Sequence, residues 1–168
     1  MKYLYYYKTT QRSNNANKSN NIKCNVFTPK IGRLFFPGEL RSIKLIGVRL
    51  LFQTITLGKA KIYVVSDGRD LIHTSYVIPK CSKFAFMNKD DYEIGPCFTY
   101  PQYRGKGIYP AVLQSICNDL GNDNTIFYMI VDEDNTASIK GIEKAGFKKF
   151  GIVKITKFTK RYLLETKI

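Results

Sequence analysis

Alternation of apolar and polar residues marks the middle of the chain as a β-hairpin. Residues 61–65 and 71–79 are runs rich in β-branched and aromatic residues, and residues 66–69, Ser-Asp-Gly-Arg, separate them. An Asp-Gly pair between two such runs favours a tight hairpin turn. A third run, 92–100, contains Gly95-Pro96, which interrupts strand pairing and predicts a bulge.

Helical periodicity begins soon after the third run. Apolar residues recur on one stripe from Ile108 to Leu120, and Gly121 is placed to end the helix. Pro110 is compatible with this helix because it falls in the first turn, where a missing amide costs nothing. The pattern predicts a helix that starts directly after a glycine-containing turn.

The remaining C-terminal part predicts one more helix between strands. Residues 125–131 form a nearly continuous apolar run, which is typical of a central strand covered on both faces. Residues 132–135 are polar and precede a second helix, 136–144, that ends at Ala145-Gly146. Residues 147–165 alternate apolar and charged side chains and predict two short strands.

The first third of the chain is less regular. Residues 2–8 are rich in tyrosine and predict a first strand, which we expect at or near a sheet edge because polar residues follow at once. Residues 11–21 carry five asparagines with two serines and one lysine, and this composition predicts a mobile loop. Residues 22–27 predict a short strand or connector, and 39–56 fit a helix loosely.

The composition limits the number of domains and the kinds of site that we expect. A chain of 168 residues with 44% hydrophobic residues is expected to form one domain with a substantial core. The four cysteines are far apart, so we expect buried free thiols and neither a disulfide framework nor a metal site. No run is as long as a membrane-spanning helix and the N-terminus does not resemble a signal peptide, which predicts a cytoplasmic protein that does not insert into a membrane.

The charge balance favours anionic partners. The chain has 27 Lys and Arg against 13 Asp and Glu, a formal net charge of +14. Such a balance is compatible with a polyphosphate cofactor, an anionic substrate, nucleic acid or an acidic membrane surface. The lysines are dispersed and no nucleic-acid-reading module is recognisable, so we do not expect a nucleic-acid partner.

The turn before the first predicted C-terminal helix has the chemistry of an anion site. It reads Gln102-Tyr103-Arg104-Gly105-Lys106-Gly107. Two glycines let the backbone bend tightly, and the first amides of the helix that follows lack partners. Those donors and the positive end of the helix dipole together favour phosphate. Taken alone the pattern is also compatible with an ordinary strand-to-helix turn.

Three features of this succession of strands and helices resemble motifs of the GNAT superfamily of N-acetyltransferases. The first is the turn at 102–107, which is similar to the family's pyrophosphate-binding motif. The second is Asn135 with Ser138, followed by Lys-Ala-Gly-Phe at 144–147, which looks like the family's second cofactor helix. The third is Glu93, on the strand before the turn, where many members carry an acidic residue. The resemblance covers roughly residues 60–165.

The resemblance implies a mixed, mostly antiparallel α/β sheet with a splayed, bulged strand and flanking helices, and acetyl transfer from acetyl-CoA to an amine. The cofactor would lie between the strand ending at Tyr100 and the strand ending at Val131. Asn135 would bond the cofactor's arm, cap its helix, or do both. The implied cofactor contacts come from both motifs and the bulged strand: Phe98, Tyr100, Gln102, Arg104, Gly105, Lys106, Gly107, Ile108, Asn135 and Ser138.

Acetyl transfer to an ammonium acceptor needs a base and, in many schemes, an acid for the thiolate. Glu93 is the leading base, with a surface glutamate as the alternative, and His73 is the second candidate, although a lone histidine in a strand is more often structural. Many members of the family have a tyrosine on the second helix that protonates the thiolate, and this chain has Ile142 at that position. Tyr100, Tyr109 and Tyr128 are nearby candidates for this acid, and packing is the alternative role of each. Otherwise the thiolate leaves unprotonated, or the chain binds acetyl-CoA without efficient turnover.

The acceptor is the least determined part. The positive balance favours an anionic acceptor over a polyamine, and a nucleotide-linked amino sugar fits that description. Residues 73–79 and 107–110 look like GNAT members associated with bacterial surface polysaccharide synthesis. A non-catalytic module that binds acetyl-CoA as a regulator or adaptor is the alternative function, and a homodimer is compatible with either.

Overall fold

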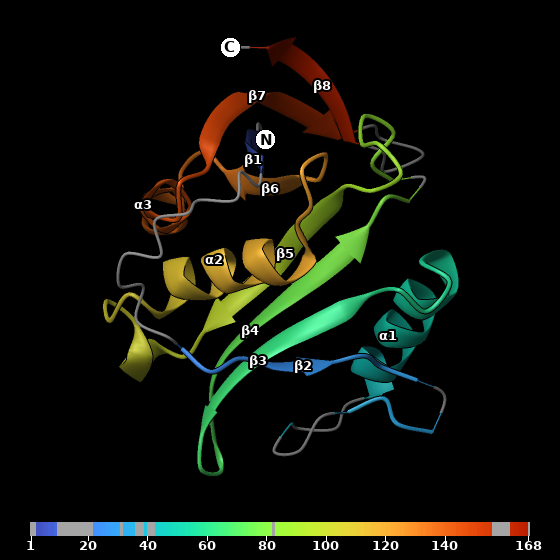
Figure 1. The fold of residues 1–168 in the computed structure, drawn as a ribbon, viewed down its shortest axis with the longest axis vertical. Helices are drawn as coiled ribbons and strands as arrows, with labels where there is room; N and C mark the ends of the chain where they lie inside the picture. The colour runs from blue at the N-terminus through green and yellow to red at the C-terminus, as the bar shows by residue number, and fades with distance from the viewer. Residues whose placement is uncertain are drawn as a thin grey trace.

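A computed structural model describes residues 3–9, 22–30, 32–35, 39, 43–81, 83–155 and 162–167 of the chain, without the side chains of 3–9, 43–45 and 164–167. The loop predicted at 11–21 lies outside the described residues. The described part forms one eight-stranded sheet in the order β2-β3-β4-β5-β6-β1-β7-β8 (Figure 1). All neighbouring strands are antiparallel except β5 and β6, which are parallel.

The strand bounds are β1 Tyr3–Thr9, β2 Asn25–Phe27, β3 Lys61–Asp67, β4 Asp70–Pro79, β5 Tyr92–Thr99, β6 Ile126–Asp132, β7 Lys148–Ile155 and β8 Tyr162–Lys167. The helices are α1 Ile43–Ile55, α2 Ile108–Leu120 and α3 Thr136–Lys144, with a short 3-10 turn, η1, at Pro101–Tyr103. The predicted mixed α/β fold with a mostly antiparallel sheet is confirmed.

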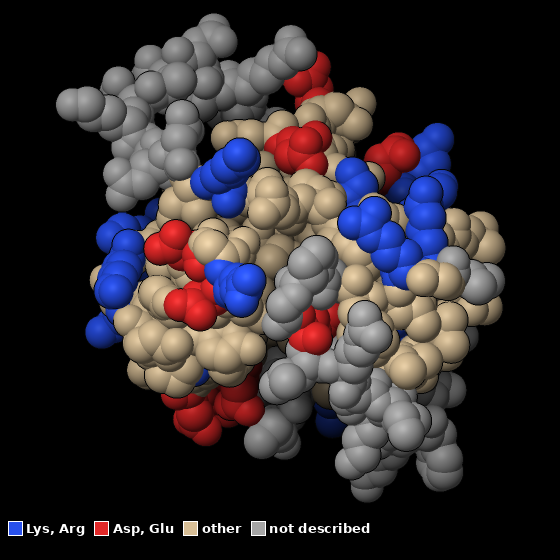
Figure 2. Space-filling view, turned by 90° about the horizontal axis from the view of Figure 1, so that it is seen from below, with Lys and Arg blue, Asp and Glu red and all other residues tan. Residues whose placement is uncertain are grey.

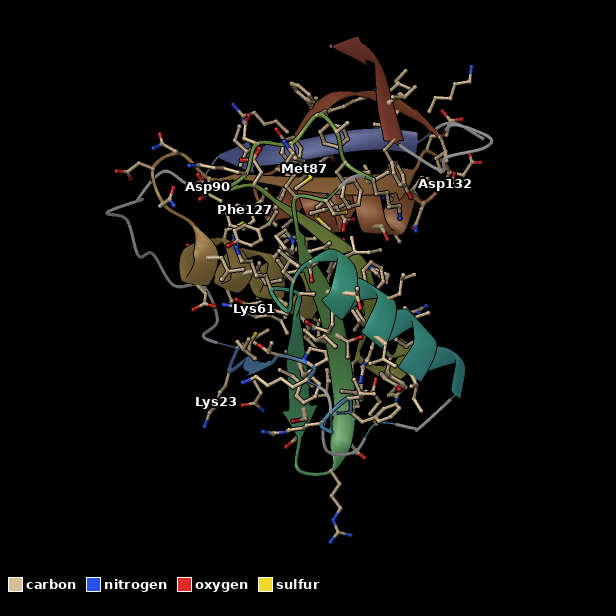
Figure 3. The ribbon with its side chains drawn as sticks, turned by 90° about the vertical axis from the view of Figure 1, so that its right-hand side faces the viewer. Lys23, Lys61, Met87, Asp90, Phe127 and Asp132 are labelled. Carbon is tan, nitrogen blue, oxygen red and sulfur yellow. The ribbon has the colours of Figure 1, made fainter. Side chains whose placement is uncertain are left out.

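Helices cover both faces of the sheet. In Figures 1 and 3, α1 lies on one face of β3 and β4, and α2 lies on the other. The larger core is formed between the sheet and α2 and α3, with Val112, Ile116 and Phe127 among its fully buried residues. The opposite face is covered by Phe52 of α1 and by Phe84 and residues near it in the connector between β4 and β5.

The parallel strands β5 and β6 pair only at their beginnings. Tyr92 lies opposite Phe127 and Glu93 opposite Tyr128, and no pairing continues beyond these positions. Buried Asp91 holds the two beginnings together, because one of its carboxylate oxygens accepts a hydrogen bond of 3.0 Å from the Ile126 amide. Gly95 and Pro96 then break the strand register, as the sequence predicted, and the two strands diverge toward their carboxyl ends.

The position of β1 corrects one prediction. Residues 2–8 were expected at or near a sheet edge, but β1 is an interior strand paired with β6 on one side and β7 on the other. The reason is a long-range pairing: the N-terminal strand inserts between two strands from the second half of the chain. A polar segment after a strand therefore does not indicate that the strand lacks a second partner.

One buried ion pair fixes α1 to the sheet. Arg49 is 1% exposed and pairs with Glu39, and its guanidinium also donates a hydrogen bond of 3.1 Å to the Tyr76 hydroxyl on β4. The guanidinium carbon lies 5.4 Å from the Phe35 ring centroid and 5.9 Å from that of Phe27. Buried charge is tolerated when it is paired and hydrogen-bonded, so this cluster joins α1, β2 and β4 into one unit.

Candidate functional site

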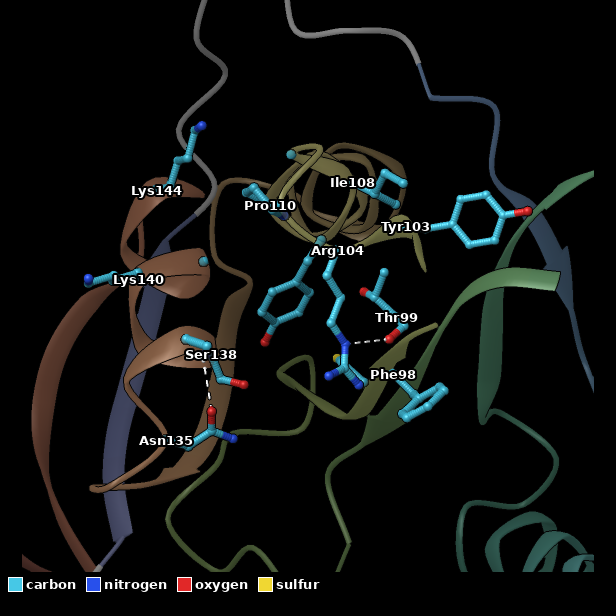
Figure 4. A pocket seen from close by; sticks show the side chains of 16 residues that line it. Phe98, Thr99, Tyr103, Arg104, Ile108, Pro110, Asn135, Ser138, Lys140 and Lys144 are labelled. Atoms are coloured by element: carbon cyan, nitrogen blue, oxygen red, sulfur yellow. Dashed lines mark hydrogen bonds between the residues drawn. The ribbon is translucent and has the colours of Figure 1, made fainter. Parts of the chain in front are cut away.

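A pocket of about 510 Å³ lies where β5 and β6 diverge, between the first turn of α2 and the length of α3 (Figure 4). This volume is within the range of small-molecule sites. Its lining comes from β5, the glycine turn, α2 and α3: Cys97, Phe98, Thr99, Tyr103, Arg104, Gly105, Gly107, Ile108, Tyr109, Pro110, Asn135, Ala137, Ser138, Lys140, Gly141 and Lys144.

The glycine turn offers main-chain donors to the pocket. Gly105 and Gly107 both have positive φ, +75° and +74°, which an L side chain rarely adopts. Gly107 is the N-cap of α2 and supplies no side chain to satisfy the first helical amides. Among the described residues, the amides of Gly105 to Tyr109 have no hydrogen-bond acceptor. These amides and the helix dipole make this corner of the pocket a site for an anion.

Arg104 crosses the pocket from the glycine turn toward β5 (Figure 4). Its Nε donates a hydrogen bond of 2.9 Å to the Thr99 carbonyl, and its guanidinium carbon lies 5.7 Å from the Phe98 ring centroid. The hydrogen bond uses Nε, so the two terminal nitrogens remain available to a phosphate. The predicted side-chain contribution of Arg104 to anion binding stays a prediction.

Asn135 at the start of α3 acts as a helix cap. Its side-chain oxygen accepts a hydrogen bond of 3.1 Å from the Ser138 amide, drawn as a dashed line in Figure 4. The same side chain lines the pocket, and its amide nitrogen has no acceptor in the part of the chain that the structure describes. The cap is therefore established, and the nitrogen is free to donate to a ligand.

The diverging edge of β5 exposes main-chain groups to the pocket. The Tyr100 amide donates to the Ile72 carbonyl of β4 at 3.0 Å, so in an antiparallel ladder the groups of Phe98 also point to β4. Those of Cys97 and Thr99 then point the other way, into the gap left by β6. The expectation of free donors near Phe98 and Tyr100 is corrected here: the amides aimed at the gap belong to Cys97 and Thr99.

A buried chain of polar side chains runs along the pocket floor. His73 is fully buried, with Nδ1 2.6 Å from the Thr99 hydroxyl and Nε2 2.7 Å from the Ser75 hydroxyl. The Ser75 hydroxyl donates to Cys97 Sγ at 3.1 Å. Burial lowers the pKa of His73 to about 4, so the imidazole is neutral at neutral pH. His73 thus orients pocket residues without lining the pocket itself.

Tyr109 contacts Cys97 at the end of this series of hydrogen-bonded side chains. Its hydroxyl hydrogen-bonds to the Cys97 sulfur, and burial raises the pKa of the phenol and keeps it protonated. The ring packs against α3 at Gly141, where a Cβ would lie 2.5 Å from Tyr109 Cδ1. Ile142, by contrast, is 1% exposed and belongs to the core. Glycine at position 141 therefore provides the space in which the Tyr109 ring sits.

Glu93 lies just before the bulge, on the sheet face opposite α2. Its cross-strand neighbours Ile78 and Tyr128 belong to the core on that face. Burial raises the pKa of the Glu93 carboxyl to about 8, and nearby Lys83 opposes this shift. A Cβ on Gly95 would lie 2.7 Å from Glu93 Oε1, so a larger residue at the bulge would displace the carboxylate from this position.

Glu93 also interacts electrostatically with the pocket end of the polar chain. Burial raises the pKa of the Cys97 thiol to about 12, the Ser75 hydrogen bond opposes this shift, and the Glu93 charge adds to it. The same charge contributes to the raised pKa of Tyr109, after burial and Cys97. A titratable carboxylate, a thiol and a phenol are therefore gathered where β5 departs from β6.

The predicted site residues fall into two groups. Those that line the pocket are Phe98, Arg104, Gly105, Gly107, Ile108, Asn135 and Ser138 from the cofactor set, and Tyr109 from the catalytic set. Those that do not are Tyr100, Gln102 and Lys106 from the cofactor set, and Glu93 and His73 from the catalytic set. Gln102 and Lys106 are exposed, and the Lys106 ammonium lies 5.3 Å from the Tyr103 ring centroid.

Several lining residues were not predicted. Cys97 and Thr99 flank the predicted Phe98 on β5, and all three line the pocket. Lys140 and Lys144 are spaced four apart on α3, which places them on one side of the helix. That spacing is visible in the sequence, but only the orientation of α3 shows that both residues line the pocket.

Comparison with models of protein families identifies the family of the chain. The model of the acetyltransferase (GNAT) family matches residues 63–147, half of the chain, including β5, the glycine turn and α3. The chain belongs to the GNAT family of acetyltransferases.

Solved GNAT structures share the fold at low sequence identity. One is an acetyltransferase of the GNAT family from Colwellia psychrerythraea, with a TM-score of 0.54 and 15% identity over 88% of this chain and 52% of that one. Another is a putative GNAT acetyltransferase from Novosphingobium aromaticivorans, with a TM-score of 0.56 and 12% identity over 90% of this chain and 61% of that one. The present chain thus spans a little over half of each neighbour. No curated protein matches it.

Two further observations concern other kinds of site. Within the described residues no group of three or more His, Cys, Asp or Glu could hold a metal ion, and the four cysteines are free. No helix in the same part of the chain is long and apolar enough to cross a membrane. On the face shown in Figure 2, Lys and Arg are interspersed with Asp and Glu.

Proposed function

We propose that this GNAT protein transfers the acetyl group of acetyl-CoA to a primary amine of a small molecule. The observation that carries the proposal is the composition of one continuous pocket. Unpaired amides at the start of α2 lie on one side of it, and Cys97 and Tyr109, next to buried Glu93, lie at the β5 bulge. Acetyl-CoA supplies the acetyl group as a thioester.

Each end of the pocket has a separate task in this proposal. The amides of Gly105 to Tyr109 and the Arg104 guanidinium hold the diphosphate. The Asn135 side-chain nitrogen donates to the pantetheine arm. At the gap in the sheet, the amides of Cys97 and Thr99 donate to the thioester carbonyl oxygen as it gains negative charge. Each donor is fixed by secondary structure, so little reorganisation is needed when charge develops.

The proton leaves the acceptor on the Glu93 side. A primary amine is mostly an ammonium ion at neutral pH, so it must lose a proton before it attacks. Glu93 accepts that proton directly or through water, and its pKa of about 8 is well matched to the task. The Tyr109 hydroxyl donates to the departing sulfur from the other side of the bulge. In this proposal Glu93 removes one proton from the ammonium ion and Tyr109 gives one to the sulfur, and the second proton is lost from the nitrogen after attack and returns through solvent to the Tyr109 oxygen.

A test of Tyr109 separates hydrogen bonding from packing. Tyr109→Phe keeps the ring against Gly141 and removes only the hydroxyl. We expect kcat to fall by about 10- to 100-fold with the KM for acetyl-CoA nearly unchanged. Tyr103→Phe is the matched control, because Tyr103 also lines the pocket, and it should stay within about twofold of the wild type. Equal rates for the two variants would rule out the Tyr109 role.

The acceptor is proposed to be an anionic amine, such as a nucleotide-linked amino sugar. Two observations support this: the net charge of +14, and Lys83, which is near enough to Glu93 to lower its pKa against the effect of burial. The Lys83 ammonium lies over the Tyr162 ring, 4.8 Å from its centroid. An acceptor that carries a negative charge would be attracted to this side of the sheet, and a polyamine would be repelled.

An acceptor panel tests the function. Thiol release from acetyl-CoA, with product identification by mass spectrometry, is measured with nucleotide amino sugars, amino acids, polyamines and lysine peptides. We expect turnover with an anionic amine and little with polyamines. Turnover only with polyamines would refute the anionic acceptor and leave the acetyltransferase intact. Acetyl-CoA binding without turnover on any acceptor would favour a non-catalytic module instead.

A further inference from the structure

A second, smaller cavity lies at the other end of β5 from the pocket described above. Its volume is about 240 Å³. The first pocket is lined by residues 97–99 at the end of β5, whereas this cavity is lined by Tyr92 at its beginning. The rest of its lining comes from the end of α1, the end of β4, the turn before β5 and the loop after α2. The two cavities have no lining residue in common, so this one is a separate candidate site.

Three lysines from three separate segments line this cavity. Lys59 follows α1, Lys80 follows β4, and Lys89 is in the turn before β5. Within the described residues, none of the three ammonium groups forms an ion pair or a hydrogen bond, and all three residues are exposed. Asp90, labelled in Figure 3, is the one acidic residue among the described residues that line the cavity. The lining therefore has more positive than negative charge, which favours an anion.

The cavity also has an apolar edge, which is formed by a strained residue. Leu57 has φ of +51° and is, in the part of the chain that the structure describes, the one residue other than glycine with positive φ. The Gly58 amide donates to the Gln53 carbonyl at 2.8 Å, a bond that normally ends a helix through glycine at the position of Leu57. The Leu57 side chain is 86% exposed, so contacts within the protein do not offset the strain. Strain of this kind is typical of positions that are used in binding.

We propose that this cavity binds a small organic phosphate. The three lysines hold the phosphate group, and Leu57 and Ile55 cover the apolar body of the ligand. A phosphate monoester carries close to two negative charges at neutral pH, which ammonium groups neutralise. Both apolar side chains line the cavity and are exposed, and binding removes their surface from water. The site is independent of the proposed acetyl transfer, because it uses no residue of the first pocket.

The test compares three probes by NMR titration of the full chain, in which shifts of assigned amides show where each probe binds. Phenyl phosphate has both parts of the proposed ligand, inorganic phosphate lacks the apolar body, and benzoate carries a single charge. We expect phenyl phosphate to shift the amides around Lys59, Lys80 and Lys89 and to bind about fivefold more tightly than either other probe. Equal binding of benzoate or of inorganic phosphate, or shifts confined to the glycine turn, would overturn the proposal.

Removal of two lysines tests the cationic part of the site. Lys59→Ala/Lys80→Ala should weaken the binding of phenyl phosphate by about fivefold, because each exposed charge pair contributes a small factor. Lys148→Ala/Lys149→Ala is the matched control: it removes the same charge from exposed positions on β7 outside both cavities, and it should bind within about twofold of the wild type. Equal weakening in the two variants would indicate general attraction to a basic protein and would overturn the site.

Replacement of Leu57 separates binding from folding. Glycine adopts positive φ without strain, so Leu57→Gly should melt no lower than the wild type. The same variant should bind phenyl phosphate about threefold more weakly, with its affinity for inorganic phosphate unchanged, because the lysines remain. An unchanged affinity for phenyl phosphate would mean that Leu57 does not contact the ligand, and it would overturn the proposed apolar edge.

Discussion

Glu93→Gln should lower kcat by about 100- to 1000-fold at pH 7.5 while leaving acetyl-CoA affinity within about twofold of the wild type. Glutamine has the shape of glutamate and fills the same buried site beside Gly95, but it cannot accept the proton of an ammonium ion. Glu143→Gln provides the control, since Glu143 is exposed on α3 and does not line the pocket. Steady-state kinetics with a saturating acceptor measure the effect.

The pH dependence of the rate tests the role of Glu93 as the base independently. The active form of a base is deprotonated, and burial raises the pKa of Glu93 to about 8. The wild-type rate should therefore rise about tenfold per pH unit below pH 8 and level off above it. This limb should be absent in Glu93→Gln. An undiminished rate in the variant, or the same limb in both proteins, would remove Glu93 as the base.

Gly105→Glu should abolish acetyl-CoA binding, with at least a 100-fold loss of affinity. Two effects combine. The residue has φ of +75°, which costs a side chain about 1–2 kcal/mol, and a carboxylate would be introduced beside the amides that hold the diphosphate. A Cβ there meets no other atom within 4 Å, so a local clash does not explain the loss.

The hairpin glycine supplies the matched control for that substitution. Gly68 also has positive φ, +56°, and open space around it, but it lies in the β3–β4 turn and does not line the pocket. Gly68→Glu should carry a similar conformational cost and bind acetyl-CoA as the wild type does. If Gly105→Glu and Gly68→Glu bind equally well, the glycine turn is not the phosphate site.

Local patterns predicted most of the fold. The Asp67-Gly68 hairpin, the bulge at Gly95, and the helices α2 and α3 with their terminators were readable because each depends on residues close together in sequence. The place of β1 was not readable. Its insertion between β6 and β7 depends on pairing with strands more than a hundred residues away, and no local signal reports such a pairing.

The site was predictable to the same extent. The glycine turn and Asn135 carry their chemistry in the backbone and the helix starts, so their spacing was enough. Which residue of β5 faces the gap depends on the bulge, and this is why Cys97 and Thr99 replaced Tyr100 as the source of free amides. The fit of Tyr109 against Gly141 arises from helix packing, which sequence spacing does not contain.

The most direct test of the central claim is calorimetric titration of the wild-type chain with acetyl-CoA, with Gly105→Glu and Gly68→Glu titrated in parallel. The account predicts one site per chain, saturable binding by the wild type and by Gly68→Glu, and no detectable binding by Gly105→Glu. An absence of binding by the wild type, or equal binding by all three proteins, would contradict the assignment of the pocket between β5, α2 and α3 as the acetyl-CoA site.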